Sequence, residues 1–163
     1  MKTVLADVAF GGAICAVGDG CAQKIGSAPI DMRRTAAVAS YGAFAAVPYH
    51  LWYRQLAVQF PGRSPRAIAG KTACELLIAL PVWEIPMFTL WTGKFGRGES
   101  IEQSLEALRA GWAHGILAGW SVWGPASLLT FAVVQQPRNQ LRTLYTAGAV
   151  WACVISWMSF DKG

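Results

Sequence analysis

Ionisable side chains stand inside stretches of this sequence that are otherwise apolar, and these residues could carry chemistry. Asp19 ends the first such stretch, Lys71 and Glu75 are four residues apart in the third, and Glu84 follows shortly after. A charge in an apolar helix is costly in lipid, so each needs a partner or a function. Such residues line ion paths and proton relays, and the pattern raises the possibility of a polar path through a membrane.

Each of these residues also has a plainer interpretation. Asp19 could meet Lys71 or an arginine of a neighbouring helix, or it could stay wetted by head-group water. Lys71 and Glu75, at i,i+4 spacing, most simply form an ion pair within one helix. The alternative places both on the inner face of a bundle, lining a polar path.

Glu84 is the most unusual of them, because Pro81 and Pro86 flank it. Two prolines so close together predict a broken or strongly bent helix. Broken helices that carry a carboxylate mark ion paths in transporters. The same side chain could equally lie at a lipid surface or against a partner subunit, and the sequence leaves these alternatives open.

His50 and Arg54 lie one helical turn apart and could select anions or sense pH. We favour a different interpretation, in which Trp52, Tyr53 and Arg54 anchor the helix at the membrane–water interface. Aromatic rings with a polar edge favour that zone, and the arginine head extends from it toward the head groups.

The sequence contains no recognised catalytic or metal-binding motif. There is no G-x-S-x-G, no H-E-x-x-H, no paired acidic cluster and no glycine-rich phosphate loop. The four cysteines form no C-x-x-C, and no histidine lies at ligand spacing from them. We interpret them as small buried apolar residues. We therefore expect no enzyme activity, no catalytic residue, no cofactor and no metal.

The elements that position these residues are apolar helices of membrane-spanning length. A helix rises about 1.5 Å per residue, so roughly twenty apolar residues cross a hydrocarbon core of about 30 Å. Five stretches qualify, at about 3–23, 35–60, 68–91, 112–134 and 143–160.

The composition agrees with a membrane protein. The chain is 54% hydrophobic and 14% charged, with a mean hydropathy of +0.35, whereas soluble domains are about 25% charged. We attribute the net charge of +5 to loops that face anionic head groups, and not to nucleic acid. The expected partners are membrane lipids and other membrane-protein subunits.

Local signals place several helix ends and contacts. Asp31 is placed to cap the second helix, and Pro48 should bend it. Residues 100–103 read as a capping box that opens an amphipathic interfacial helix, before the chain enters the membrane near residue 112. Gly111, Gly115 and Gly119 then recur at four-residue steps and predict a helix-packing interface.

The predicted architecture is thus an all-α polytopic bundle of four to five spans with proline-kinked helices and one interfacial helix. Residues 1–163 form a single membrane-embedded domain. Orientation stays undecided, because for five spans the lysines and arginines divide equally between the two sides. One side takes Lys2, Arg54, Arg63, Arg66, Lys71, Arg138 and Arg142, and the other takes Lys24, Arg33, Arg34, Lys94, Arg97, Arg109 and Lys162.

A series of short motifs resembles one known family in order and spacing. The motifs are Gly18-Asp19-x-x-x-Gln23, Asp31 with Arg34-Thr35, Pro48-x-His50-x-Trp52-Tyr53, Phe60-Pro61-Gly62, Lys71 with Glu75, Pro81, and Trp151-x-x-x-x-Ser156-Trp157. Together they resemble the Mpv-seventeen and twenty-two-kilodalton peroxisomal membrane protein family over almost the whole chain.

The resemblance implies a compact helical bundle in the mitochondrial inner or the peroxisomal membrane, and some members of the family are described as weakly selective pores for small solutes. The positions that match the family pattern are Asp19, Gln23, Arg34, His50, Trp52, Lys71 and Glu75. With Glu84, the charged and polar members of this set are our candidates for a pore or polar network.

The chain departs from the family pattern at several positions, above all in its second half. Its Trp-Pro element becomes Trp123-Gly124-Pro125, Leu76 stands where the family commonly has Gln, and Glu84 stands where apolar residues are usual. The polar residues of that half are largely lost.

Two functions follow from these observations. The first, which we favour at this point, is a non-catalytic accessory subunit of a large mitochondrial inner-membrane complex. It rests on the lost polar residues and on the expectation that the glycine interface is exposed. The alternative is a free-standing, weakly selective pore for small solutes in the mitochondrial inner or peroxisomal membrane.

Overall fold

The computed structural model describes residues 2–25 and 29–160, and the described residues form helices joined by short connections, with no strand among them. The elements are α1 (Lys2–Ile25), α2 (Met32–Gln59), α3 (Pro65–Cys74), η1 (Glu75–Glu84), α4 (Ile85–Trp91), η2 (Thr92–Arg97), α5 (Ile101–Val133) and α6 (Pro137–Phe160). The prediction of an all-helical bundle is confirmed.

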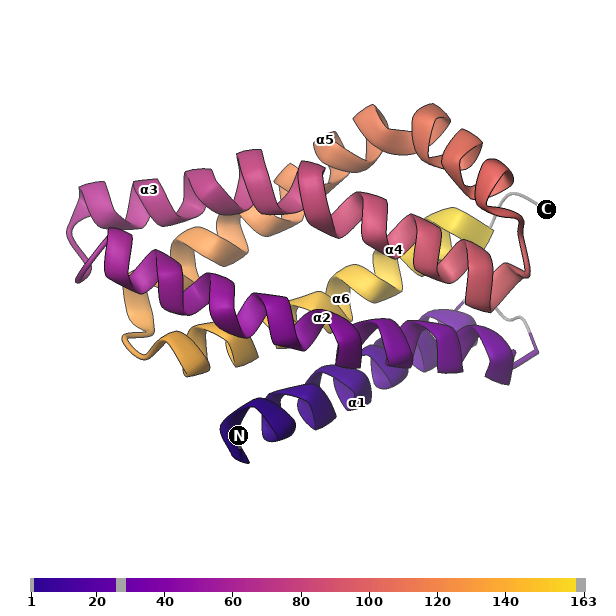
Figure 1. Ribbon diagram of the computed structural model, residues 1–163, viewed down its shortest axis with the longest axis horizontal. Coiled ribbons are helices and arrows are strands. Elements are labelled where there is room, and N and C mark those ends of the chain that lie inside the picture. The colour runs from indigo at the N-terminus through magenta and orange to yellow at the C-terminus, as the bar shows by residue number, and fades with distance from the viewer. Residues whose placement is uncertain (1, 26–28, 161–163) are drawn as a thin grey trace.

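The helices run back and forth along one axis (Figure 1). Because α3, η1, α4 and η2 follow one another without a break, they make a single pass, and the chain makes five passes in all. The α2–α3 and α5–α6 turns lie together at one end of the bundle, which we call the α2–α3 end. The start of α2 and the connection into α5 lie at the opposite, α1–α2 end (Figure 1).

Among the described residues, three segments are long and apolar enough to cross a membrane: Thr3–Ile25, Pro65–Arg97 and Ile101–Val133. The spans that we predicted at 35–60 and 143–160, in α2 and α6, are not among them. Polar residues of these two helices, such as Arg34 and Tyr41 of α2 and Gln140 of α6, are buried.

Polar residues lie inside this bundle and apolar residues cover its surface. Asp7, Asp19 and Gln23 are at most 2% exposed, whereas Val58 and Val82 are 76% and 69% exposed. A water-soluble protein would place such residues the other way round. The arrangement is the one expected where hydrocarbon surrounds the helices and ionisable groups face the interior of the bundle.

The predicted helix starts are confirmed. The Asp31 carboxylate accepts hydrogen bonds from the backbone N–H groups of Arg33 and Arg34, at 2.9 and 3.1 Å. Ser100 and Gln103 form the capping box at the start of α5. The segment expected as a separate interfacial helix forms the first turns of α5, which continues unbroken to Val133.

The region around Pro81 adopts a π-helix, not a break. In a π-helix each backbone N–H bonds to the carbonyl five residues earlier, and at the end of η1 the Ile85 N–H bonds to the Leu80 carbonyl in this register. A proline lacks the N–H that this register needs. Pro81 therefore leaves the Leu76 carbonyl without its helical donor.

Tryptophans of α5 supply the missing donors. The Trp120 indole N–H donates to the Leu76 carbonyl at 2.9 Å. The Trp112 indole N–H donates to the Pro81 carbonyl at 3.0 Å, the acceptor that Pro86 leaves free in the same register. These two bonds join α5 to the proline-containing pass at two points.

The glycines of α5 pack mainly inside the molecule. A Cβ on Gly119 would come within 2.7 Å of a Leu80 methyl carbon, and one on Gly115 would lie 3.4 Å from Ile85. A Cβ on Gly111 would meet nothing within 4 Å. Gly115 and Gly119 thus pack against α4 and η1 of the same chain, and our expectation that they are exposed to a partner is wrong.

An apolar cluster fills the bundle toward the α2–α3 end. It consists of Tyr53, Leu56, Phe131, Leu141 and Leu144, all at most 3% exposed. The prediction that Tyr53 anchors the membrane interface is wrong, because this ring lies in the core against Phe131, with 6.1 Å between ring centroids. Arg54, in contrast, is exposed.

Candidate functional site

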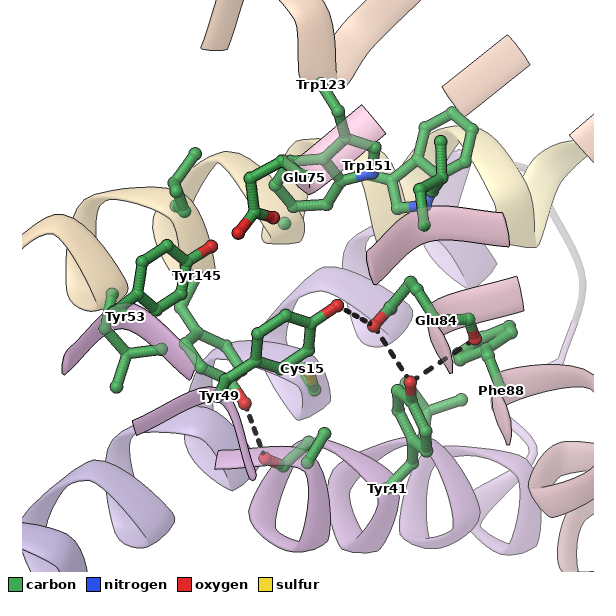
Figure 2. Close-up of a pocket in the computed structure, with 17 residues that line it drawn as sticks. Cys15, Tyr41, Tyr49, Tyr53, Glu75, Glu84, Phe88, Trp123, Tyr145 and Trp151 are labelled. Carbon is green, nitrogen blue, oxygen red and sulfur yellow. Dashed lines mark hydrogen bonds between the residues drawn. The ribbon is translucent and has the colours of Figure 1, made fainter. Parts of the chain in front are cut away.

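A cavity lies at the centre of the bundle (Figure 2). It offers about 80 Å³ to the centres of water-sized molecules, which is room for several waters. Every one of the five passes contributes to its wall. The principal lining residues are Cys15 of α1, Tyr41, Tyr49 and Tyr53 of α2, Glu75 and Glu84 of η1, Phe88 of α4, Trp123 of α5, and Tyr145 and Trp151 of α6.

Glu84 is held by two hydroxyl groups of α2. Tyr41 and Tyr49 donate hydrogen bonds to its Oε2 atom at 3.0 and 2.8 Å, and these bonds are drawn in Figure 2. The two tyrosines are eight residues apart, so they lie on the same face of α2 about two turns from each other. Of the alternatives for Glu84, the structure shows the interior one and not the lipid surface.

Glu75 faces the same cavity from an earlier turn of η1. Its Oε1 accepts a hydrogen bond from the Trp52 indole N–H at 2.6 Å. Trp52 is therefore a hydrogen-bond donor to a carboxylate inside the bundle, a role that we did not predict when we interpreted this residue as an interface anchor. Seen in Figure 2, the carboxylates of Glu75 and Glu84 border one shared space.

The ion pair predicted between Lys71 and Glu75 does not form. The Lys71 ammonium donates to the Gly62 carbonyl at 3.2 Å, and its nitrogen lies 5.9 Å from the centroid of the Phe131 ring. Lys71 is 3% exposed but is absent from the cavity wall. The two side chains diverge because each reaches a nearer partner, Lys71 at the α2–α3 turn and Glu75 at Trp52.

The charge of the cavity wall is one-sided. Among the described lining residues there are two carboxyl groups and no lysine, arginine or histidine. Tyrosine hydroxyls and the Cys15 thiol supply its other polar atoms. Such a wall suits a small cation or a hydroxylated solute better than an anion, because carboxylates and hydroxyls offer acceptors and repel negative charge.

A second polar group joins α1 to α2 outside the cavity. Asp19 Oδ1 accepts a hydrogen bond from Arg34 Nε at 2.8 Å. Its Oδ2 accepts from Gln23 at 2.6 Å and from Thr35 at 2.8 Å. Of the alternatives for Asp19, the arginine of a neighbouring helix is the one formed, and Lys71 is not involved. Three family-pattern positions thus form one network that ties two helices together.

A third polar group surrounds Asp7 near the start of α1. His50 Nδ1 lies 2.9 Å from Asp7 Oδ2, and Arg142 Nε donates to Asp7 Oδ1 at 3.2 Å. Arg138 Nε forms a longer ion pair with Oδ1 at 3.5 Å. His50 is thereby joined to α1 and α6, and not to the central cavity. Asp7 was missing from the predicted set.

One face of α1, with residues spaced four apart, contributes to the central cavity and to both of the polar groups described above. Asp7, Gly11, Cys15, Asp19 and Gln23 follow one another at i,i+4 spacing, so they lie on one face of the helix. At Gly11 this face approaches α2 so closely that a Cβ would lie 2.5 Å from the carbonyl oxygen of the facing residue. The periodicity was visible in the sequence and would have identified Asp7.

Comparison with known proteins agrees with the motifs. The chain is similar to an Mpv17-like protein of Bos taurus, 28% identical over 142 residues that cover 83% of this chain and 67% of that protein. An Mpv17-like protein of Xenopus laevis is 26% identical over 160 residues, or 96% and 73% of the two chains. The Mpv17 / PMP22 family model matches residues 95–156. The chain is thus similar to proteins of the Mpv17 / PMP22 family. Protein SYM1 of Eremothecium gossypii is 29% identical over 110 residues, 65% of this chain and 59% of that protein. No solved structure matches.

In this chain, the positions that match the family pattern fall into separate groups. Trp52 and Glu75 meet at the cavity wall, whereas Asp19, Gln23 and Arg34 meet between α1 and α2. The family's closing element includes Ser156 and Trp157, whose side chains lie outside the described residues. The apolar helices fit a membrane protein similar to this family, and its polar groups lie in the interior of a helical bundle.

Proposed function

We propose that this protein belongs to the Mpv17 / PMP22 family and is a pathway for small polar solutes across an organelle membrane, with the mitochondrial inner membrane as its site ahead of the peroxisomal membrane. The central cavity supports this proposal over the accessory-subunit role that we favoured from the sequence. No catalytic role and no cofactor is part of the proposal.

The observation that carries the proposal is a cavity in the middle of the bundle that is large enough for several water molecules and is lined by two carboxyl groups. An ionisable residue in the interior of a transmembrane bundle is by default a candidate for a substrate or ion path. All five passes contribute to the wall, so that solute access depends on the packing of the whole chain. The π-helical segment η1 supplies both carboxyl groups, and π-helical turns are frequent at functional sites.

The apolar cluster supports a closed resting form. Leu56 and Phe131 are 2% and 0% exposed and lie next to Tyr53, a residue that belongs to both the cavity wall and the cluster. Lys71 then covers the Phe131 ring from the turn region. A hydrophobic constriction of this kind stops water and ions without a steric lid. Conduction requires the cluster to part.

The accessory-subunit role is the second candidate, and the loss of polar residues in the second half of the chain still favours it. The other observation behind it is gone, because Gly115 and Gly119 pack against the protein's own helices. Migration of the native species in mild-detergent extracts separates the two roles. A species that migrates alone fits the pathway, and one confined to a large complex fits the subunit.

Planar-bilayer recording of the purified chain tests the pathway. We expect conductance with a preference for cations over anions, and we expect Glu84→Gln to lower that preference several-fold while keeping the shape of the side chain. Glu106→Gln serves as the control, because this glutamate is exposed on α5 and absent from the cavity wall. The proposal fails if the wild-type chain does not conduct, or if both variants change selectivity equally.

A further inference from the structure

The corner where α1, α2 and α6 meet carries more positive than negative charge. Asp7 is the acid there, 1% exposed, and it faces His50, Arg138 and Arg142. Arg54 lies one turn beyond His50 on the same face of α2 and is exposed. One carboxylate thus faces two guanidinium groups, with a third close by. The positive charge exceeds what Asp7 balances.

We infer that this corner is a binding site for a phosphate group, as carried by the head group of an anionic phospholipid or by inorganic phosphate. Asp7 engages both arginines through Nε, one by a hydrogen bond and one by an ion pair. Their terminal nitrogens make no hydrogen bond to any described residue. Two guanidinium groups held in this way can present several N–H donors to the oxygens of one phosphate.

The exposure of the two arginines fits this use. Their side chains are 41% and 35% exposed, whereas Asp7 beneath them is buried. The Arg142 guanidinium also lies 5.6 Å from the centroid of the Phe10 ring, which restricts its position. The Arg138 Nε atom is buried and makes no hydrogen bond among the described residues, and its only acidic neighbour there is Asp7 Oδ1 at 3.5 Å. A phosphate oxygen would give this guanidinium group a closer acceptor.

The site also lies where a phosphate would be found. Arg138 is in the first turn of α6, so the positive end of that helix dipole adds to the guanidinium charges. The α2–α3 end also carries the exposed arginines Arg63 and Arg66. The acids outside the interior lie at the opposite end, in or just before the first turns of α2 and α5. These acids are Asp31, Glu99, Glu102 and Glu106.

This charge distribution is hidden when lysines and arginines alone are counted. The count is equal for the two sides, but the described acids outside the interior stand at the α1–α2 end only. The α2–α3 end is therefore the more positive, and it favours the leaflet with more anionic lipid. The inference does not depend on the proposed pathway, because Asp7, Arg138 and Arg142 do not line the cavity.

Native mass spectrometry of the detergent-solubilised full chain tests the site, with dioleoyl phosphatidylglycerol as the probe and dioleoyl phosphatidylcholine as the zwitterionic comparison. We expect the wild type to retain phosphatidylglycerol, and the double variant R138Q/R142Q to bind it at least tenfold more weakly. R109Q is the matched control, since Arg109 is exposed at the other end, and it should change affinity less than threefold.

A competition arm separates the two sources of the phosphate group. Inorganic phosphate that displaces phosphatidylglycerol at millimolar concentration shows that both reach one site. Binding of inorganic phosphate without retention of phosphatidylglycerol supports the site with the free anion as its ligand. Equal lipid binding by R138Q/R142Q and R109Q, or no preference over phosphatidylcholine together with no phosphate binding, overturns the inference.

The double variant removes both arginine partners of Asp7 and so could lower the yield of folded protein. R54Q avoids this problem, because no contact to Asp7 involves Arg54 among the described residues. We expect R54Q to fold and to weaken phosphate-group binding two- to fivefold. If the double variant does not fold, R54Q and the wild type test the inference. It is overturned if R54Q binds phosphatidylglycerol as tightly as the wild type does and inorganic phosphate fails to displace the lipid from the wild type.

Discussion

The pairing of Trp120 with Pro81 leads to a quantitative prediction. Trp120→Phe removes the N–H that reaches the Leu76 carbonyl at 2.9 Å and keeps most of the aromatic ring. The indole is 40% exposed, so the change in buried apolar area is small. One net hydrogen bond contributes about 0.5–1.5 kcal/mol, and couplings within membrane bundles average about 0.6 and reach about 1.7 kcal/mol. We expect a loss of about 1 kcal/mol.

The same substitution should matter less when residue 81 regains an N–H. In Pro81→Ala, the new amide can bond to the Leu76 carbonyl in the π register of η1, so the indole becomes dispensable. Trp120→Phe should then cost only a few tenths of a kcal/mol. A double-mutant cycle over these two substitutions therefore has an expected coupling energy of about 1 kcal/mol.

Reversible unfolding in mixed micelles of mild detergent and sodium dodecyl sulfate measures the four free energies. Trp120→Phe combined with Pro86→Ala is the crossed control, because Pro86 leaves a different carbonyl to Trp112. That pair should be additive within about 0.5 kcal/mol. A matched-pair coupling below about 0.3 kcal/mol, or equal couplings in the matched and crossed pairs, would refute the donor-replacement reasoning.

Three further outcomes are expected. Asp19→Asn should lower the free energy of unfolding by about 3 kcal/mol or more, because it removes the charge that faces a buried arginine at 2.8 Å; mixed-micelle unfolding measures this. Gly119→Ala should destabilise by about 1–3 kcal/mol through overpacking, whereas Gly111→Ala should change stability by less than about 0.5 kcal/mol. The third concerns pH. A hydrogen bond from Arg97 holds the pKa of Glu99 below its usual value, so its contribution to stability is present above the unfolded pKa of about 4.3 and is lost as the pH falls through the lower folded pKa. Lowering the pH from about 5 to about 3 should therefore lower the thermal unfolding temperature of the wild type more than that of Glu99→Gln. Equal dependence of the two unfolding temperatures on pH would contradict this.

The helices and their starts could be predicted because they depend on short-range signals. Asp31 and Ser100 cap helices through bonds to residues two or three positions away, which a sequence shows directly. Pro81 and Pro86 correctly marked an irregular pass. The family motifs identified Asp19, Gln23 and Arg34, which the structure then brings together.

Partners on different helices could not be predicted from spacing alone. Lys71 and Glu75 have the spacing of an ion pair, yet each reaches a partner on another segment of the chain. The tyrosines that hold Glu84 belong to α2, more than thirty residues away. Such contacts depend on the rotation and depth of whole helices, and η1 shifts both through its wider register. Tyr53 similarly reads as an interface residue until the packing of α5 places Phe131 beside it.

The contacts of Asp7 have a consequence for biogenesis. Its arginine partners are at positions 138 and 142 in α6, which leaves the ribosome after the other described helices. Until α6 has been made, His50 of α2 is therefore the one of these described partners that the Asp7 carboxylate can contact. A chain truncated before α6 would keep that acid exposed to hydrocarbon, a signal that membrane quality-control factors could detect. The polar contacts of α1 are thus completed only once α6 has been made, so that stable insertion depends on translation of α6.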